Sequence, residues 1–220
     1  MNAHPIPLAG AALSALPCGA LLWPEARLLA VADLHLGKAR RAARRGGALL
    51  PPYEVRETLD RLAAALAETG AETLVCLGDS FDDAAAAAEI GAAEIAGLMA
   101  GRRWIWVTGN HDPGPGPGGE TRAEFRLGPL TFRHVAEPGA RGEISGHYHP
   151  KARLPGLRAR PCFLADAARV ILPAFGTYTG GLDCRAPAFA GLFGAGALAV
   201  LTGTRPRAVP LAAMGAAVGA

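Results

Sequence analysis

The chain has 220 residues, half of them hydrophobic and 19% charged, which is typical of a globular protein and excludes a disordered chain. No uncharged apolar run reaches the roughly 18 residues of a membrane span, and the Pro-interrupted N-terminus does not resemble a secretory signal. No membrane partner is therefore expected. A net charge of +3 is too small to indicate a nucleic-acid partner by itself. Four cysteines without CxxC spacing favour a reduced, cytoplasmic protein.

Short apolar runs alternate with helix-like segments along the chain, which predicts a single-domain α/β fold over residues 1–220. In chain order the predicted elements are strands 19–23 and 28–32, helix 54–68, strand 73–77, helix 83–100, and strands 104–108, 130–134, 142–145, 161–164, 169–172 and 197–202. The first helix is predicted from apolar residues at helical spacing between Val55 and Leu66. The second is predicted from its alanine content, and Gly101 is expected to end it.

Two segments are predicted to lack regular structure. The Pro/Gly run at 113–119 can form neither a helix nor a central strand, so it is either a simple connector or a flap over bound substrate. Residues 205–220 are rich in alanine and glycine and are expected to be poorly ordered.

Four polar blocks each follow a predicted strand. They are Asp33-Leu34-His35, Gly78-Asp79, Gly109-Asn110-His111-Asp112 and Gly146-His147-Tyr148-His149. In open α/β sheets ligands bind at the carboxyl ends of the strands, so these blocks can meet at one place. Together they offer three carboxylates, one amide and four imidazoles, which is a suitable ligand set for two divalent cations. The pattern therefore favours a two-metal hydrolase.

Each block also has a simpler interpretation. A single D-x-H is most often an ordinary polar segment at the surface, a Gly-Asn pair is common in turns, and two neighbouring histidines can be coincidence. The presence of all the blocks in one chain outweighs these interpretations. On a continuing strand Asp33 and His35 would point to the same side. A carboxylate such as that of Asp79 has two oxygens and can bridge two cations.

The order D-x-H, G-D, G-N-H-D, a later single histidine and G-H-x-H resembles the calcineurin-like metallophosphoesterase superfamily over about residues 28–180. Three further stretches, at 32–38, 49–54 and 173–182, resemble the bacterial ligase-associated DNA damage response endonuclease family. The resemblance implies a four-layer sandwich of two mixed β-sheets flanked by helices. One residue departs from the family pattern: Asp82 stands where a histidine is expected, and it could support a metal ligand or change substrate handling.

The resemblance also implies ligands for two metal ions. One ion is held by Asp33, His35, Asp79 and His149, and the other by Asp79, Asn110, His134 and His147. His134 is the only histidine between His111 and His147, although it could instead be a half-buried histidine of strand 130–134. Oxygen and imidazole ligands without thiolate favour Mn²⁺, Fe²⁺ or Zn²⁺, and the resemblance places Mn²⁺ first.

His111 resembles the catalytic histidine of the superfamily rather than a metal ligand. The implied mechanism is attack on phosphorus by a hydroxide that bridges the two metals. His111 would act as the general acid that protonates the leaving oxygen. Asp112 either hydrogen-bonds the His111 imidazole and holds it in place, or caps the following turn.

Two basic clusters flank the proposed site. The first comprises Lys38, Arg40, Arg41, Arg44 and Arg45, and the second comprises Lys151, Arg153, Arg158 and Arg160. Such clusters are commonly no more than a solvated face. Their position on both sides of a phosphate-cleaving site favours contacts with the DNA backbone, which we expect for the first cluster.

The leading hypothesis is a binuclear-metal-dependent phosphodiesterase and DNA endonuclease in DNA repair, acting on single-stranded or structured DNA. The resemblance implies a ligase and a helicase of the same pathway as partners. The alternatives are a phosphatase or nucleotide hydrolase for a small phosphoester, and a non-catalytic binding subunit with the same fold. The intact polar blocks argue against the last alternative.

Overall fold

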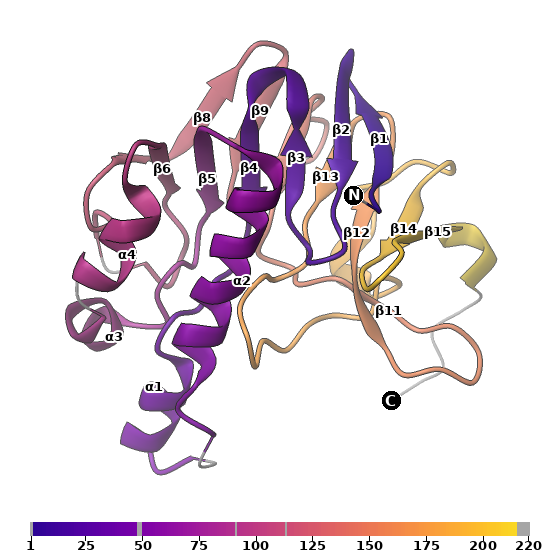
Figure 1. Ribbon diagram of the computed structural model, residues 1–220. Coiled ribbons are helices and arrows are strands. Elements are labelled where there is room, and N and C mark those ends of the chain that lie inside the picture. The colour runs from indigo at the N-terminus through magenta and orange to yellow at the C-terminus, as the bar shows by residue number, and fades with distance from the viewer. Residues whose placement is uncertain (1, 48–49, 91, 113, 215–220) are drawn as a thin grey trace.

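Two mixed β-sheets lie face to face in the computed structural model (Figure 1). The structure describes residues 2–47, 50–90, 92–112 and 114–214. Within these residues the first sheet has seven strands in sequence order. They are β1 (His4–Leu8), β2 (Ala11–Ala15), β3 (Leu21–Trp23), β4 (Leu28–Val31), β5 (Thr73–Leu77), β6 (Arg103–Val107) and β7 (Glu120–Arg122). Strands β4 to β7 run parallel, whereas the N-terminal strands β1 to β4 pair antiparallel.

The second sheet comes from the rest of the chain and has the order β15-β14-β12-β13-β10-β9-β8, with β11 paired to β12. Its strands are β8 (Glu124–Leu127), β9 (Leu130–Arg133), β10 (Glu143–Ser145), β11 (Lys151–Ala152), β12 (Arg160–Ala165), β13 (Arg169–Ile171), β14 (Leu198–Leu201) and β15 (Arg207–Pro210). At its centre β10 runs parallel to both neighbours, β9 and β13. Each sheet therefore has a parallel group of strands whose carboxyl ends can hold ligands.

The helices form the outer layers. The α-helices are α1 (Lys38–Arg44), α2 (Glu54–Thr69), α3 (Ala84–Glu89) and α4 (Ala92–Met99), and the short 3₁₀ helices are η1 (Pro24–Ala26), η2 (Pro187–Phe189) and η3 (Leu211–Met214). In Figure 1, α2 crosses in front of the first sheet, and α3 and α4 lie at its β6 side. No helix within the described residues is long and apolar enough to cross a membrane.

Three apolar cores separate four layers. Val75 and Phe132 belong to the core between the two sheets, and Leu62 of α2 packs with Trp104 of β6 in the core under the helices. The third core covers the outer face of the second sheet with η2, through Phe189, and neighbouring loops. The predicted four-layer sandwich is thus confirmed, with an outer layer on the second sheet that has 3₁₀ turns and loops where the first sheet has α-helices.

Most predicted elements are found, with ends that differ by one or two residues. Strand 73–77 is β5, and helix 54–68 is α2. β5 was predictable because it is apolar on both faces, as expected of a buried parallel strand. The prediction of one helix over 83–100 is wrong: the segment contains two helices, α3 and α4. The Asp83 side chain caps α3 by accepting a hydrogen bond from the Ala86 N–H at 2.8 Å.

The segments predicted to be irregular have partly ordered structure. Within 205–220 the chain forms β15 and η3, while residues 215–220 lie outside the described part of the chain. The Pro/Gly run forms a loop over its described residues 114–119, and its Gly118 carbonyl accepts a hydrogen bond from Trp106 Nε1 at 2.9 Å. Pro113 lies outside the described residues, and the flap interpretation of this loop stays a prediction.

Candidate metal centre

The predicted ligands all follow the carboxyl ends of parallel strands. The donors come from the loops after β4, β5, β6, β9 and β10, and they are Asp33, His35, Asp79, Asn110, His134, His147 and His149. Six of them form two clusters, one of Asp33, His35 and His149 and one of Asp79, His134 and His147, with the ligand atoms of each cluster within 4.8 Å of one another. The two groups are subsets of the two ligand sets that the resemblance implied, which also included Asn110 and placed Asp79 in both.

In the first cluster a buried carboxylate faces two imidazoles. His149 Nε2 lies 3.4 Å from Asp33 Oδ1 and 3.4 Å from His35 Nε2. Asp33 is fully buried and His35 is 4% exposed. Buried carboxylates and imidazoles placed this close need a shared proton or a cation between them. The donor set fits a divalent metal ion that accepts oxygen and nitrogen ligands.

The second cluster has the same character, and the hydrogen bonds fix the tautomer of its central histidine. His134 Nδ1 lies 2.8 Å from the Leu77 carbonyl oxygen, which can only accept, so Nδ1 carries the proton. Nε2 lies 3.0 Å from Asn110 Oδ1 and 3.2 Å from His147 Nδ1, and only in the neutral ring, the form that binds a metal ion, does it offer a lone pair there. Three acceptor atoms that converge in this way leave a position that a metal ion fits.

Asp79 faces both clusters. Its Oδ2 lies 3.9 Å from His35 Nε2 in the first cluster, and its Oδ1 lies 3.5 Å from His134 Nε2 in the second. Burial alone would raise the pKa of Asp79, but hydrogen bonds from His134 and from the His111 N–H lower it to about 2. The carboxylate therefore stays ionised near neutral pH, in the form that can bridge two cations.

The pKa values of the two imidazoles in the second cluster are shifted in opposite directions. Burial lowers the pKa of His147, and the charge of His134 lowers it further, which keeps this ring in its neutral, ligating form. Burial also acts to lower the pKa of His134, but the hydrogen bond with Asp79 and the negative charges of Asp33 and Asp79 outweigh it and raise the pKa. The two carboxylates that raise this pKa also make the site attractive to a cation.

The ligating loops have an unusual backbone that sequence reasoning missed. Five ligands have positive φ angles: Asp33 (54°), His35 (43°), Asp79 (48°), His147 (72°) and His149 (48°). β4 ends at Val31, so Asp33 and His35 do not lie on a continuing strand, and the strand argument for their shared side does not apply. Each left-handed residue other than glycine costs about 1–2 kcal/mol, and such strain concentrates at functional sites. The contacts of the surrounding structure must compensate this cost.

Two glycines of the polar blocks are required by close packing within the site. A Cβ at Gly78 would overlap the His134 ring, and a Cβ at Gly109 would overlap the Asp79 backbone nitrogen. The glycines before Asp79 and Asn110 are therefore explained by the contact between neighbouring loops.

His111 lies beside the metal ligands without joining either cluster. Its backbone N–H donates to Asp79 Oδ1 at 2.8 Å. Its ring packs edge-on against the ring of His35, with centroids 5.3 Å apart. The side chain is thus next to the first cluster, where it can reach a substrate held there.

Asp112 serves the backbone of the site. Its Oδ1 accepts hydrogen bonds from the N–H groups of Ser80 (2.8 Å) and Phe81 (3.2 Å), and its Oδ2 accepts from Gly109 N–H at 2.8 Å. These contacts tie the loop after β5 to the loop after β6. They differ from both alternatives that the sequence left open for Asp112, because the partners are the preceding turn at Gly109 and the loop after β5 rather than the His111 ring or the following turn.

Comparison with known proteins identifies the family. Residues 26–161 match the family model described as calcineurin-like phosphoesterase. The chain belongs to this family. The crystal structure of Pseudomonas putida nuclease MPE is similar, with a TM-score of 0.74 and 31% sequence identity over 96% of this chain and 100% of that one. No match was found among curated proteins. The protein is therefore a metal-dependent phosphoesterase, and the similar structure is that of a nuclease.

In this phosphoesterase a second carboxylate contacts the predicted ligand His35. Asp82 Oδ1 lies 3.0 Å from His35 Nδ1, and its other oxygen accepts a hydrogen bond from Arg41 Nη1 at 2.9 Å. Burial opposes ionisation of Asp82, but the bonds with His35 and Arg41 lower its pKa to about 2. The residue that departs from the family pattern therefore orients a predicted metal ligand, as an outer carboxylate commonly does.

We expect Asp82→Ala to weaken the binding of one metal ion by about 10- to 100-fold, because His35 loses the partner that fixes its orientation and tautomer. Titration of the metal-free protein with Mn²⁺ in a calorimeter measures this affinity. Asp83→Ala is the matched control, since Asp83 caps α3 and pairs with Arg44 without touching a ligand. Equal Mn²⁺ affinity in Asp82→Ala and wild type would contradict the role.

The first basic cluster is only partly directed to solvent. Arg41 pairs with Asp82 and Arg44 with Asp83, at 2.9 and 2.7 Å, so these two arginines dock α1 onto the loop after β5. Lys38 is half-buried, while Arg40 and Arg45 are exposed. DNA contacts by this cluster stay a prediction.

The second cluster also mixes internal contacts with exposed charges. Lys151 Nζ donates to the Thr179 carbonyl at 3.2 Å, and Arg160 donates to the Thr202 carbonyl. Arg153 and Arg158 are exposed. Lys151 and Arg160 are thus held by backbone carbonyls of the protein.

Proposed function

We propose that this phosphoesterase is a binuclear-metal-dependent phosphodiesterase that cleaves DNA internally. The observation that supports it most is the position of Asp79, whose two carboxylate oxygens face two complete donor clusters. The similarity to a nuclease over nearly the whole of both chains favours a nucleic acid over a small phosphoester. Mn²⁺ is the proposed metal, since the donors are carboxylate, amide and imidazole groups without thiolate.

The side chains of the site divide the work of the reaction. When bound, two divalent cations supply a nucleophile near neutral pH and neutralise charge on the transferring phosphoryl group. The donors named above would hold them, and Asp79 keeps the two positions together. His111, which is tied to Asp79 through its backbone, donates a proton to the leaving oxygen as general acid. Asp112 fixes the loop that carries His111.

We further propose that the enzyme acts in DNA repair in the cytoplasm, on single-stranded or structured DNA. The support is the resemblance of residues 32–38, 49–54 and 173–182 to the ligase-associated endonuclease family. The same resemblance suggests a ligase and a helicase of that pathway as partners.

The test is incubation of the chelated protein with circular single-stranded and double-stranded DNA, with each divalent metal restored in turn. We expect no cleavage in EDTA, the strongest recovery with Mn²⁺, and two metal ions per chain by elemental analysis. Linear products from a circle show internal cleavage. Full activity in EDTA would contradict the two-metal mechanism, and faster hydrolysis of phosphomonoesters than of diesters would favour the small-substrate phosphatase.

A further inference from the structure

The loop over residues 175–182 borders the first metal cluster at both of its ends. At its start Gly176 N–H donates to the Asp33 carbonyl at 3.1 Å. At its end Lys151 N–H donates to the Leu182 carbonyl at 2.8 Å, and a Cβ at Gly181 would overlap the His149 carbonyl oxygen. The loop therefore joins the backbones of two metal ligands, and none of its side chains has a part in the proposed chemistry.

A pocket of about 220 Å³ lies against this loop. Its lining includes Gly176 and Thr179 of the loop, together with Arg61 of α2 and Lys151 of β11. The pocket has room for several waters, since one water takes about 30 Å³ in the liquid. Because Gly176 is bonded to the Asp33 backbone, the pocket shares a wall with the metal centre.

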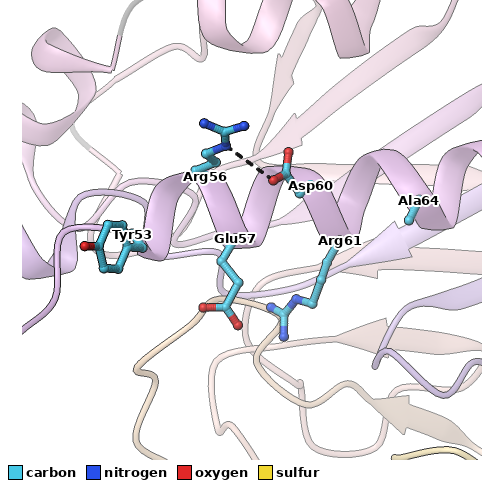
Figure 2. Close-up of a pocket in the computed structure, with 6 residues that line it drawn as sticks. All are labelled: Tyr53, Arg56, Glu57, Asp60, Arg61 and Ala64. Carbon is cyan, nitrogen blue, oxygen red and sulfur yellow. Dashed lines mark ion pairs between the residues drawn. The ribbon is translucent and has the colours of Figure 1, made fainter.

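The Arg61 guanidinium is anchored on one side only. It donates to the Phe175 carbonyl and lies over the Phe175 ring, 4.8 Å from its centroid, but its buried Nε has no hydrogen-bond partner. Figure 2 shows Arg61 reaching from α2 toward the loop, on the opposite side of the helix from Arg56, which pairs with Asp60. Burial lowers the pKa of Arg61, and the charge of Glu57 only partly opposes this effect.

Lys151 brings a second positive charge to the same pocket. Its Nζ donates to the Thr179 carbonyl at 3.2 Å. Within the described residues neither Lys151 nor Arg61 forms an ion pair with a carboxylate. Two cations that line one pocket and form no ion pair there favour an anionic ligand, and a guanidinium matches the oxygens of a phosphate. Arg61 also borders an open groove along α2, so a ligand can approach it from solvent.

We propose that this pocket binds the phosphate of a nucleotide adjacent to the one that is cleaved, through Arg61 and Lys151. The inference rests on the proposed function, because it takes DNA as the substrate. It assigns the 175–182 loop the role of holding the strand in register: a phosphate in the pocket lies on one side of the loop, and the scissile phosphate lies at the metal centre on the other.

The first experiment compares Arg61→Gln and Lys151→Gln with the control Arg56→Gln, whose side chain is 88% exposed on the same helix. A single charge-assisted contact predicts a loss of about 10- to 100-fold in affinity for a labelled single-stranded oligonucleotide in each pocket variant and none in the control. The slope of log affinity against log salt should fall by about 0.7 per variant. Mn²⁺ content and hydrolysis of a small diester should be unchanged, which also shows that the variants are folded.

The second experiment removes the charge from the DNA instead of the protein. A single methylphosphonate is placed in turn at each phosphate around the cut. In wild type, a methylphosphonate at one neighbouring position should lower the affinity as much as Arg61→Gln does. In Arg61→Gln, the methylphosphonate at that position should lower the affinity no further. Equal methylphosphonate profiles in the two proteins overturn the inference. A higher melting temperature of wild type in inorganic phosphate would then show only that the pocket binds free phosphate, not DNA. If wild type fails to cleave DNA at all, the proposed function is what fails.

Discussion

His111→Ala is expected to lower the turnover of DNA by about 10²- to 10⁴-fold, the usual contribution of a general acid, while both metal ions stay bound. The reason is that the His111 ring lies against His35 but belongs to neither donor cluster. Only its backbone N–H contacts a ligand, at Asp79 Oδ1, and alanine keeps that hydrogen bond. Turnover and metal content per chain, measured on the same preparation, check both parts of the expectation.

Leaving-group dependence separates a general acid from a residue that merely holds the substrate. A nitrophenolate leaving group needs little protonation, so His111→Ala should slow nitrophenyl diesters much less than DNA. His4→Ala is the matched control, since His4 lies on β1, outside both donor clusters, and should change neither rate. Equal losses for good and poor leaving groups would argue against proton donation, and loss of a metal ion would make His111 a ligand.

The composition of the site was predictable because it depends on local sequence. A polar block after an apolar strand predicts a ligand at the carboxyl end of that strand, and Asp79 after β5 illustrates this. His134 is harder to assign, since its alternation with Phe132 is also that of an ordinary strand histidine. The structure places it directly after β9, buried, with Nε2 facing Asn110.

The contacts that hold the site residues in place were not predictable, because they join segments that are distant in the sequence. Arg41 and Asp82 are 41 residues apart, and only the docking of α1 on the loop after β5 makes them partners. The run of arginines therefore suggested DNA contacts from the sequence, whereas in the structure Arg41 holds Asp82, which in turn contacts the predicted ligand His35. The left-handed backbone at Asp33 and His35 has only a weak local signal, since Asp and His adopt positive φ more often than most residues but far less often than glycine. The break between α3 and α4 was likewise hidden by a uniform alanine composition.

Asp79→Asn is expected to reduce activity by about a thousandfold, the equivalent of several kcal/mol of lost charge stabilisation in the transition state. The substitution keeps the size of the side chain and an oxygen that can accept from His111 N–H. It removes the negative charge that faces His35 through Oδ2 and His134 through Oδ1. A neutral amide has one oxygen and cannot bridge the two positions, so at least one metal ion per chain should be lost.

Elemental analysis and the rate of diester hydrolysis test this expectation together, across a range of Mn²⁺ concentrations. Asp60→Asn is the matched control, because its carboxylate lies on the exposed side of α2 with 72% of the side chain accessible. Excess Mn²⁺ should restore only part of the activity of Asp79→Asn, since higher concentration fills a weakened position but does not recreate a bridging carboxylate. A variant that keeps two tightly bound metal ions per chain and near-normal turnover would show that Asp79 does not link the two clusters.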